Sequence, residues 1–97
     1  MIDVQDIKEI ADYYGYEEQS NQLIEECAEL IQAVNKLRRS HRANKKDFYN
    51  LVEEIADVEI MLAQVKHLLG IHPRDVERLK ICKIQRQKER MAHGKDS

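Results

Sequence analysis

The sequence predicts an all-α domain, and three observations lead to this prediction. Strict alternation of apolar and polar residues, the pattern of a half-buried strand, is nowhere sustained along the 97 residues. Long segments instead repeat apolar residues with the period of an amphipathic helix. The three glycines and the single proline fall at the ends of these segments. We therefore expect one domain, residues 1–97, built from four helices.

The amino-acid composition favours a folded helical protein over a disordered or nucleic-acid-binding one. Charged residues make up 35% of the chain and hydrophobic residues 42%, a balance that suits amphipathic helices and argues against disorder. The net charge of −2 gives no reason to expect binding to a nucleic-acid polymer. Cys27 and Cys82 lie on apolar helix faces and are interpreted as reduced core residues. Since no stretch resembles a membrane span or a signal peptide, we expect a soluble, cytoplasmic protein with no membrane partner.

The first helix is expected over residues 4–14. Asp3 can cap its first turn by accepting a backbone N–H, and Asp6 places a negative charge near the positive end of the helix dipole. Gly15 is a natural stop, because glycine readily adopts the backbone conformation that ends many helices.

The second helix is expected to begin at Ser20 or at the preceding Glu17-Glu18 pair and to run to about residue 39. It leads into a cationic, weakly hydrophobic segment, residues 38–47, which is too polar to pack and is expected to form a mobile loop or a frayed helix end. Two roles are open for this basic segment. It is either a solvated linker whose charges favour the C-terminal end of the helix, or a flap that attracts phosphates over an acidic cleft.

A third helix is expected from Phe48 to about residue 69, with Asp47 as its N-cap and Gly70 as its end. Pro73 suits the first position of a fourth helix, whose first turn is acidic and whose remainder is densely basic. The terminal residues 93–97 are expected to fray.

The third helix is apolar around nearly its whole circumference. A helix of this kind has more apolar surface than one small chain can cover, so we expect a homodimer or a homotetramer formed through it. Glu59 also lies among these apolar residues, where a Lys or Arg across an interface would balance its charge. The apolar residues are Leu51, Val52, Ile55, Val58, Ile60, Met61, Leu62, Val65 and Leu69.

An acidic pattern occurs twice in the chain, once in each long helix. The segment 23–30, Leu-Ile-Glu-Glu-Cys-Ala-Glu-Leu, is echoed by the segment 51–58, Leu-Val-Glu-Glu-Ile-Ala-Asp-Val. On a helical wheel with about 100° per residue, Glu26 falls inside the apolar arc of its helix and Glu29 falls at the edge of that arc. The second segment repeats this arrangement, so each helix carries an acidic pair at the border of its core-facing surface. The pair in the second segment is Glu54 and Asp57.

If the two helices pack together, the repulsion among their four negatively charged carboxylates has to be compensated. At a separation of about 6 Å and an effective dielectric constant of about 20, each like-charge pair costs on the order of 3 kcal/mol. Protonation, salt bridges to Lys or Arg, or a divalent cation would relieve this repulsion, and a cation does so best because it neutralises two charges at once. The alternative interpretation is a solvated acidic helix face.

The type of ligand indicates which cation would bind. Carboxylates without histidine or thiolate are hard ligands that suit Mg²⁺ or Mn²⁺ rather than zinc. Neither acidic motif contains the Glu-x-x-His pattern of di-iron helix bundles, and the four histidines show no ligand spacing. The sequence also lacks a phosphate-binding glycine-rich loop and any serine or cysteine nucleophile arrangement. A Mg²⁺ site of this kind would take its remaining ligands from the phosphates of a substrate and from water.

The motif Glu25-Glu26-x-x-Glu29, followed by Glu54-x-x-Asp57, resembles the signature of the all-α nucleoside triphosphate pyrophosphohydrolases. This MazG-like superfamily includes phosphoribosyl-ATP pyrophosphatase, the dimeric dUTPases and dCTP pyrophosphatases. The resemblance spans residues 17–92. It implies a four-helix, MazG-like bundle that is assembled as an oligomer, and Mg²⁺-dependent hydrolysis of a nucleoside triphosphate by attack of water at the α-phosphorus. The products would be the monophosphate and pyrophosphate.

The resemblance also implies roles for particular residues. The metal ligands and catalytic residues would be Glu26, Glu29, Glu54 and Asp57. The nucleotide would be bound by Gln22, which precedes Glu26 by one turn, and by Lys83, Arg86 and Arg90 of the last helix, which would hold phosphates. Gln87 stands where relatives usually have asparagine. Glu25 and Glu53, the outer residues of the two Glu-Glu pairs, have either a supporting or basic role or simple exposure to solvent.

Two other functions are open. Phosphoribosyl-ATP hydrolysis would use the same acidic site. A non-catalytic helical interaction module would instead pair the acidic repeat with a basic partner surface, and it would show no dependence on metal.

Overall fold

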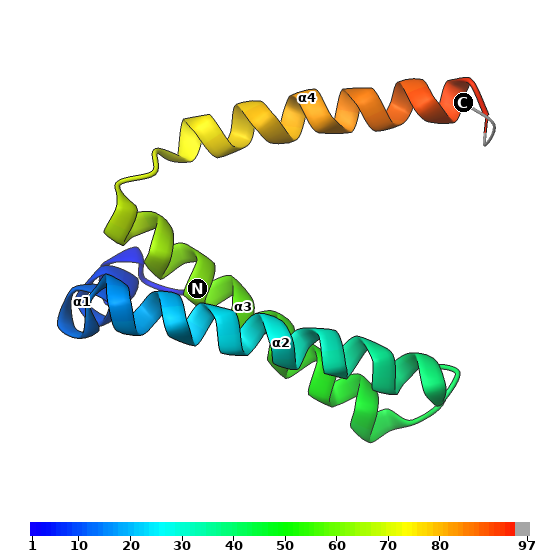
Figure 1. Cartoon of the computed structure of the whole chain (residues 1–97), viewed down its shortest axis with the longest axis horizontal. Coiled ribbons are helices and arrows are strands. Elements are labelled where there is room, and N and C mark those ends of the chain that lie inside the picture. The colour runs from blue at the N-terminus through cyan, green and yellow to red at the C-terminus, as the bar shows by residue number, and fades with distance from the viewer. Residues whose placement is uncertain (95–97) are drawn as a thin grey trace.

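The computed structural model describes residues 1–94, and these residues form four helices and no strand (Figure 1). The helices are α1 (Val4–Tyr14), α2 (Tyr16–Arg39), α3 (Lys45–Leu69) and α4 (Pro73–Ala92). The all-α prediction is confirmed. Of the predicted frayed tail, residues 95–97 lie outside the described residues, while His93 and Gly94 follow the end of α4. None of the helices in residues 1–94 has the length and apolar character needed to cross a lipid bilayer.

The first helix has the predicted ends. The Asp3 carboxylate accepts a hydrogen bond of 2.9 Å from the backbone N–H of Gln5. At the other end Gly15 has a φ of 86°, and its N–H donates to the Ala11 carbonyl at 2.8 Å. Because α2 begins at Tyr16, a single glycine turns the chain between the two helices. The second helix therefore starts before the predicted Glu17-Glu18, and these two residues lie inside its first turn.

The segment between α2 and α3 is shorter than the predicted loop 38–47. The predicted end of α2 at about residue 39 is confirmed, but the predicted start of α3 at Phe48 was wrong. Arg38 and Arg39 belong to the last turn of α2, and α3 already begins at Lys45, which leaves only residues 40–44 outside helices. The N-cap of α3 is Asn44 rather than Asp47. The Asn44 side-chain oxygen accepts from the backbone N–H groups of Lys46 and Asp47, at 2.9 and 3.2 Å.

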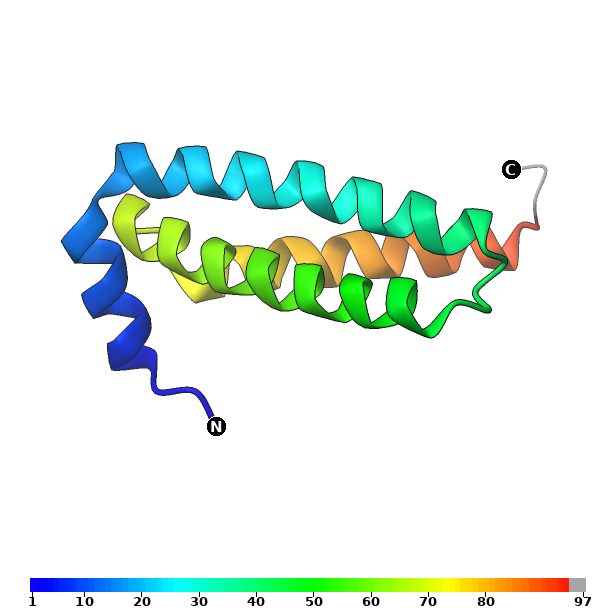
Figure 2. The same ribbon diagram turned by 90° about the horizontal axis from the view of Figure 1, so that it is seen from below.

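The two long helices, α2 and α3, run antiparallel as a hairpin, and α1 packs across one end of it (Figure 2). A buried hydrogen bond of 2.6 Å from the Gln19 side-chain nitrogen to the Gln64 side-chain oxygen joins α2 to α3 near that end. Leaving either buried amide without a partner would cost about 1–3 kcal/mol, so this pair fixes how the two helices align. The buried apolar side chains are few: Ala11, Ala33, Leu37, Val58 and Met61.

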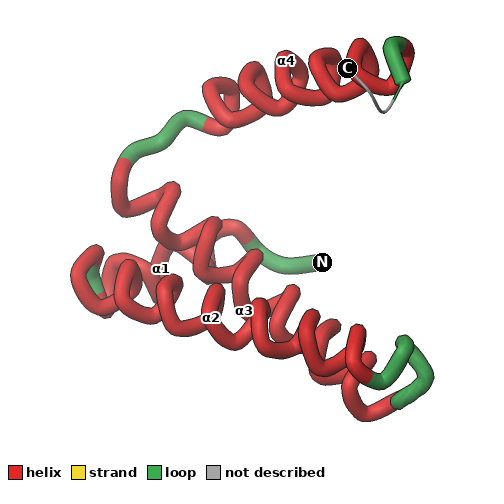
Figure 3. Tube along the Cα trace, turned by 45° about the vertical axis from the view of Figure 1, so that its right-hand side comes forward, coloured by secondary structure: helices red, strands yellow, loops and turns green. Residues whose placement is uncertain are grey.

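The fourth helix lies apart from the other three. Within residues 1–94, α4 packs against no other helix, and Figures 1 and 3 show it projecting from the end of α3. Its N-terminus matches the prediction, with Pro73 in the first turn and the His72 ring accepting the Arg74 N–H at 3.0 Å. Cys82 is exposed, so the expectation that both cysteines are core residues was wrong for this one; Cys27 is partly buried.

Candidate metal centre

The antiparallel hairpin brings the two acidic segments of the sequence together. One carboxylate oxygen from each of Glu26, Glu29 and Glu54 can be chosen so that all three lie within 4.8 Å of one another. Two of these residues come from α2 and one from α3. The predicted convergence of the two motifs therefore exists in a single chain, and we call these three residues the acidic cluster.

Two oxygens of the acidic cluster lack any partner. The Oε2 atoms of Glu26 and Glu54 are shielded from solvent and accept no hydrogen bond from the described residues. The other oxygen of Glu26, Oε1, accepts a hydrogen bond of 2.7 Å from the Gln22 side-chain nitrogen. No Lys, Arg or His of residues 1–94 forms an ion pair with the cluster. Buried carboxylate oxygens without partners are unfavourable, so these two atoms favour a bound cation.

The negative charges of the acidic cluster affect the pKa of Glu54. Burial raises the pKa of this carboxyl group above its ordinary value, and the negative charges of Glu29, Glu26 and Asp57 raise it further. A hydrogen bond with Glu29 adds to the same effect, because protonated Glu54 can donate to the Glu29 carboxylate. Without a cation, burial and the neighbouring negative charges thus both disfavour the ionised form of Glu54.

Asp57, the fourth predicted ligand, is placed differently. It lies one turn beyond Glu54 on α3 and is exposed, and its oxygens are not among those of the acidic cluster. Its charge nevertheless acts on the cluster, as the raised pKa of Glu54 indicates. Its role as a metal ligand stays a prediction.

The predicted nucleotide-binding residues are divided between two places. Gln22 lies at the acidic cluster, where it donates to Glu26. The basic residues lie on α4, which contacts no other helix of residues 1–94, so a single chain does not bring them to the carboxylates. These basic residues are Lys83, Arg86 and Arg90, all exposed. Glu25 and Glu53 are also exposed.

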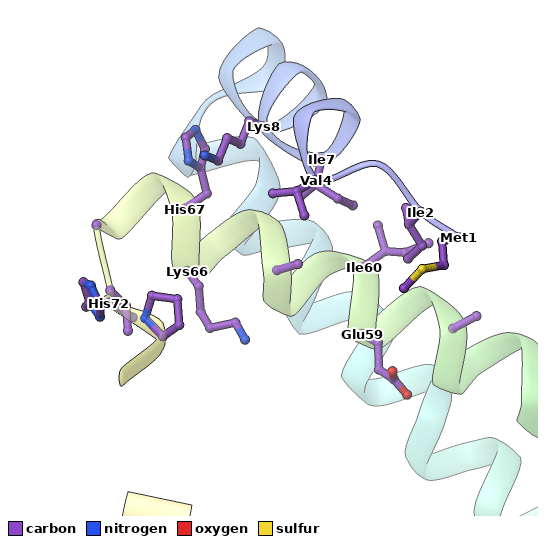
Figure 4. A pocket seen from close by; sticks show the side chains of 15 residues that line it. Met1, Ile2, Val4, Ile7, Lys8, Glu59, Ile60, Lys66, His67 and His72 are labelled. Carbon is purple, nitrogen blue, oxygen red and sulfur yellow. The ribbon is translucent and has the colours of Figure 1, made fainter. Parts of the chain in front are cut away.

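Sequence reasoning missed a groove of about 980 Å³ between α1, the C-terminal half of α3 and the turn into α4. In Figure 4, the apolar side chains of Ile2 and Val4 approach Ile60 of α3, while Glu59 and Lys66 project from α3 away from α1. Beside this groove, His67 and Asp12 form a contact of 2.8 Å between α3 and α1. No short-range pattern could reveal this pair, because its members are 55 positions apart.

The donor set fits a small, hard divalent cation. Oxygens bound to one Mg²⁺ lie about 2.1 Å from the ion, so opposite ligands are about 4.2 Å apart. The spread of at most 4.8 Å in the acidic cluster needs only small side-chain movements to reach that geometry. With carboxylate oxygens alone, the cluster suits Mg²⁺ or Mn²⁺ better than zinc or copper.

Comparison with known families agrees with this chemistry. The model of the MazG nucleotide pyrophosphohydrolase domain matches residues 15–91, which include α2, α3 and nearly all of α4. Searches of curated proteins and of solved structures give no significant match. The family match covers most of the chain and contains both acidic motifs. The chain therefore belongs to the MazG nucleotide pyrophosphohydrolase domain family.

Proposed function

We propose that this protein hydrolyses a nucleoside triphosphate to the nucleoside monophosphate and pyrophosphate, with Mg²⁺ as cofactor and Mn²⁺ as a possible substitute. The observation that carries the proposal is the acidic cluster, in which both motifs of the family meet and two buried oxygens lack partners. A solvated acidic face would leave such oxygens in contact with water instead.

Each residue of the site has a task in this proposal. Glu26, Glu29 and Glu54 would hold the cation, and Asp57 would complete the ligand set from the neighbouring turn. Gln22 orients Glu26 by donating to its Oε1 atom, which leaves the Oε2 atom for the cation. When bound, Mg²⁺ neutralises the triphosphate and lowers the pKa of a coordinated water. Lys83, Arg86 and Arg90 would bind phosphate oxygens, the role for which long cationic side chains are suited.

The proposal includes a homo-oligomer and a reducing compartment. Large apolar side chains of the hairpin are exposed in one chain, among them Ile24, Ile31, Phe48 and Val52, which supports assembly with further copies. Cys27 and Cys82 are both free, as is usual for proteins of the cytoplasm.

A panel of nucleoside triphosphates with Mg²⁺, assayed for released pyrophosphate, tests the proposal. Phosphoribosyl-ATP belongs in the same panel, because its hydrolysis would use the same site. We expect release of pyrophosphate, not of single phosphate, from at least one substrate, and its loss in the Glu26→Gln variant. No pyrophosphate from any substrate above the level of that variant would contradict the proposal and would favour a non-catalytic interaction module.

A further inference from the structure

The end of the α2–α3 hairpin that lies away from α1 carries a concentrated positive charge (Figure 1). Between Glu29 and Asp47 the chain contains six Lys and Arg and no Asp or Glu. The rest of the chain has the other ten Lys and Arg and all eighteen Asp and Glu, so it is negative. The net charge of −2 averages over these two regions and conceals their separation. We call the six cations the basic tip: Lys36, Arg38, Arg39, Arg42, Lys45 and Lys46.

The cations of the basic tip are accessible to a ligand. All six side chains are exposed, and none of them forms an ion pair with another residue of the described range 1–94. Asp47 is the only acidic residue between positions 30 and 52 of the sequence. Like charges that are gathered without counter-charges repel one another, so binding of an anionic partner stabilises this end of the hairpin.

The stability of the helices does not explain all of these charges. Lys and Arg in the last turn of a helix interact favourably with its negative end, which accounts for Lys36, Arg38 and Arg39 in α2. Lys45 and Lys46 instead occupy the first turn of α3, where the positive end of the helix favours Asp or Glu. These two lysines act against the helix that they begin, and a break of a local rule of this kind is typical of a functional surface.

The backbone of the loop at the tip is held in an unfavourable conformation. His41 and Arg42 have φ values of 53° and 65°, in the left-handed region that favours glycine. The His41 N–H donates to the Arg38 carbonyl at 3.0 Å and the Arg42 N–H donates to the Leu37 carbonyl at 2.9 Å, which are the two bonds of a Schellman motif. The Ser40 hydroxyl also donates to the Leu37 carbonyl, at 2.9 Å. The loop is therefore fixed by hydrogen bonds, and it keeps an arginine where glycine would be less strained.

An exposed aromatic ring borders the lysines of the basic tip. Tyr49 is 66% exposed, and it forms no ring contact or hydrogen bond with the other residues of 1–94. It follows Lys45 by four residues and Lys46 by three, so it neighbours both lysines on the surface of α3. On the helical wheel it falls opposite the buried Val58, on the outer side of the helix. A flat ring beside two ammonium groups offers a stacking surface for a nucleobase and charges for its phosphate.

The basic tip is separate from the acidic cluster. Ten residues of α2 lie between Glu29 and Arg39, a distance of about 15 Å along the helix axis. On α3, eight residues lie between Lys46 and Glu54, a distance of about 12 Å. A single nucleotide held by the cluster therefore cannot cover the tip. A ligand that engages all six cations has to be a longer anion.

We infer that the basic tip is a binding surface for single-stranded nucleic acid, whose phosphates bind the cations while one base stacks on Tyr49. Every nucleotide of a single strand offers a phosphate and an open base face, whereas a duplex hides its base faces. An acidic protein surface or an anionic lipid would use the charges of the tip, but it has no base to place on the Tyr49 ring. The inference is independent of the proposed pyrophosphohydrolase activity.

Fluorescence anisotropy with labelled oligouridylate and oligothymidylate tests the inference, and the two strands distinguish RNA from DNA as the source of the same chemistry. For a single strand, a plot of log Kobs against log salt concentration has a slope of about −0.7 for each phosphate contacted, so the tip allows a slope of up to about −4. The double variant Arg39→Gln/Arg42→Gln should make this slope shallower by about 1.4. The matched control Arg74→Gln/Arg78→Gln removes two charges from α4 and should leave the slope unchanged. Equal changes in both variants, or no binding of either strand at low salt, would overturn the inference.

Substitutions of the ring separate a nucleic-acid surface from a general polyanion surface. Tyr49→Ala should weaken binding of the oligonucleotide about fivefold or more, because one stacked base is lost, and Tyr49→Phe should bind like the wild type, because the ring remains. Tyr13→Ala, which removes an 81% exposed ring of α1, should have no effect. Heparin and vesicles that contain phosphatidylserine offer negative charge without bases. Unchanged affinity of Tyr49→Ala for both strands, or binding to heparin or to these vesicles but to neither strand, would overturn the inference. All of these variants keep the acidic cluster, so the measurements decide the inference whether or not the protein releases pyrophosphate.

Discussion

At the scale of single residues, the site depends on where the chain buries charge. Glu26 and Glu54 place carboxylate oxygens out of reach of water, whereas Glu25 and Glu53, their neighbours in sequence, remain exposed. Wheel positions predicted this difference, because only the inner residue of each Glu-Glu pair falls within the apolar arc. What the wheel could not predict is the partner of each oxygen, such as the amide of Gln22 on Glu26, because side-chain rotamers are decided by packing.

Glu54 makes the metal-free protein sensitive to pH. Its pKa is raised above 4.5 in the folded chain, so between pH 4.5 and this raised pKa the folded state binds this proton more often than the unfolded state does. The stabilising effect of that proton is fully present below pH 4.5 and is lost as the pH rises through the raised pKa. We expect Glu54→Gln, measured by thermal unfolding with a chelator present, to be more stable than the wild type near pH 8 and to lose that advantage toward pH 4. An advantage that does not change with pH would contradict this cause.

A cation should stabilise the fold through the same carboxylates. Binding to the folded state alone adds about 2.7 kcal/mol when the free ion is 100 times its dissociation constant. Millimolar Mg²⁺ or Mn²⁺ should therefore raise the melting temperature of the wild type and of Glu25→Gln, but not that of Glu54→Gln. Identical melting curves of the wild type with and without Mg²⁺ would count against the metal centre.

At the scale of elements, the positions of glycine and proline in the sequence predicted most of the helix ends. Gly15, Gly70 and Pro73 each stand where the sequence suggested, because their backbone preferences act locally. The start of α3 was misplaced since Asn44 and Asp47 are both good N-caps, and the choice between them depends on backbone angles that the sequence does not reveal. The pairs Gln19–Gln64 and Asp12–His67 join different helices, so no local pattern signals them.

The N-cap assignment can be checked by stability. Asn44→Ala removes the acceptor for the N–H groups of Lys46 and Asp47 and should lower the free energy of unfolding by about 1 kcal/mol. Asp47→Ala should cost only a few tenths of that, because Asp47 contributes only its charge near the positive helix end. Urea unfolding of both variants measures the difference, and a larger loss for Asp47→Ala would show that the helix begins later.

At the scale of the whole molecule, a single chain leaves much of its apolar surface uncovered. Its buried core is small, one long face of the hairpin is apolar and exposed, and α4 packs on none of the helices in residues 1–94. The apolar third helix predicted an oligomer from sequence, and that expectation stands as a proposal. The direction of α4 could not be predicted, because α4 makes no contact with the other helices of residues 1–94 that a pattern in the sequence could signal.

A charge placed among the exposed apolar side chains of the α2–α3 hairpin should separate the copies in the proposed homo-oligomer. Ile31→Glu introduces a carboxylate into the surface that we propose to be buried, and burying an unpaired charge costs several kcal/mol. We expect light scattering to give the mass of one chain for this variant and a multiple of it for the wild type. Gln32→Glu adds the same charge at the next position of α2, on another side of the helix, and should leave the assembly intact. A wild type and an Ile31→Glu variant of equal mass would contradict the proposed interface.

The central claim is that the buried carboxylates of the two motifs perform metal-assisted hydrolysis, and comparing Glu54→Gln with Glu25→Gln tests it most directly. Both substitutions remove one negative charge and keep the side-chain shape, but only Glu54 belongs to the acidic cluster. With saturating Mg²⁺ and the best substrate, kcat for pyrophosphate release should fall on the order of 10²-fold or more in Glu54→Gln. In Glu25→Gln it should fall far less. Wild-type kcat in both variants would contradict the claim and leave the acidic repeat as a solvated surface.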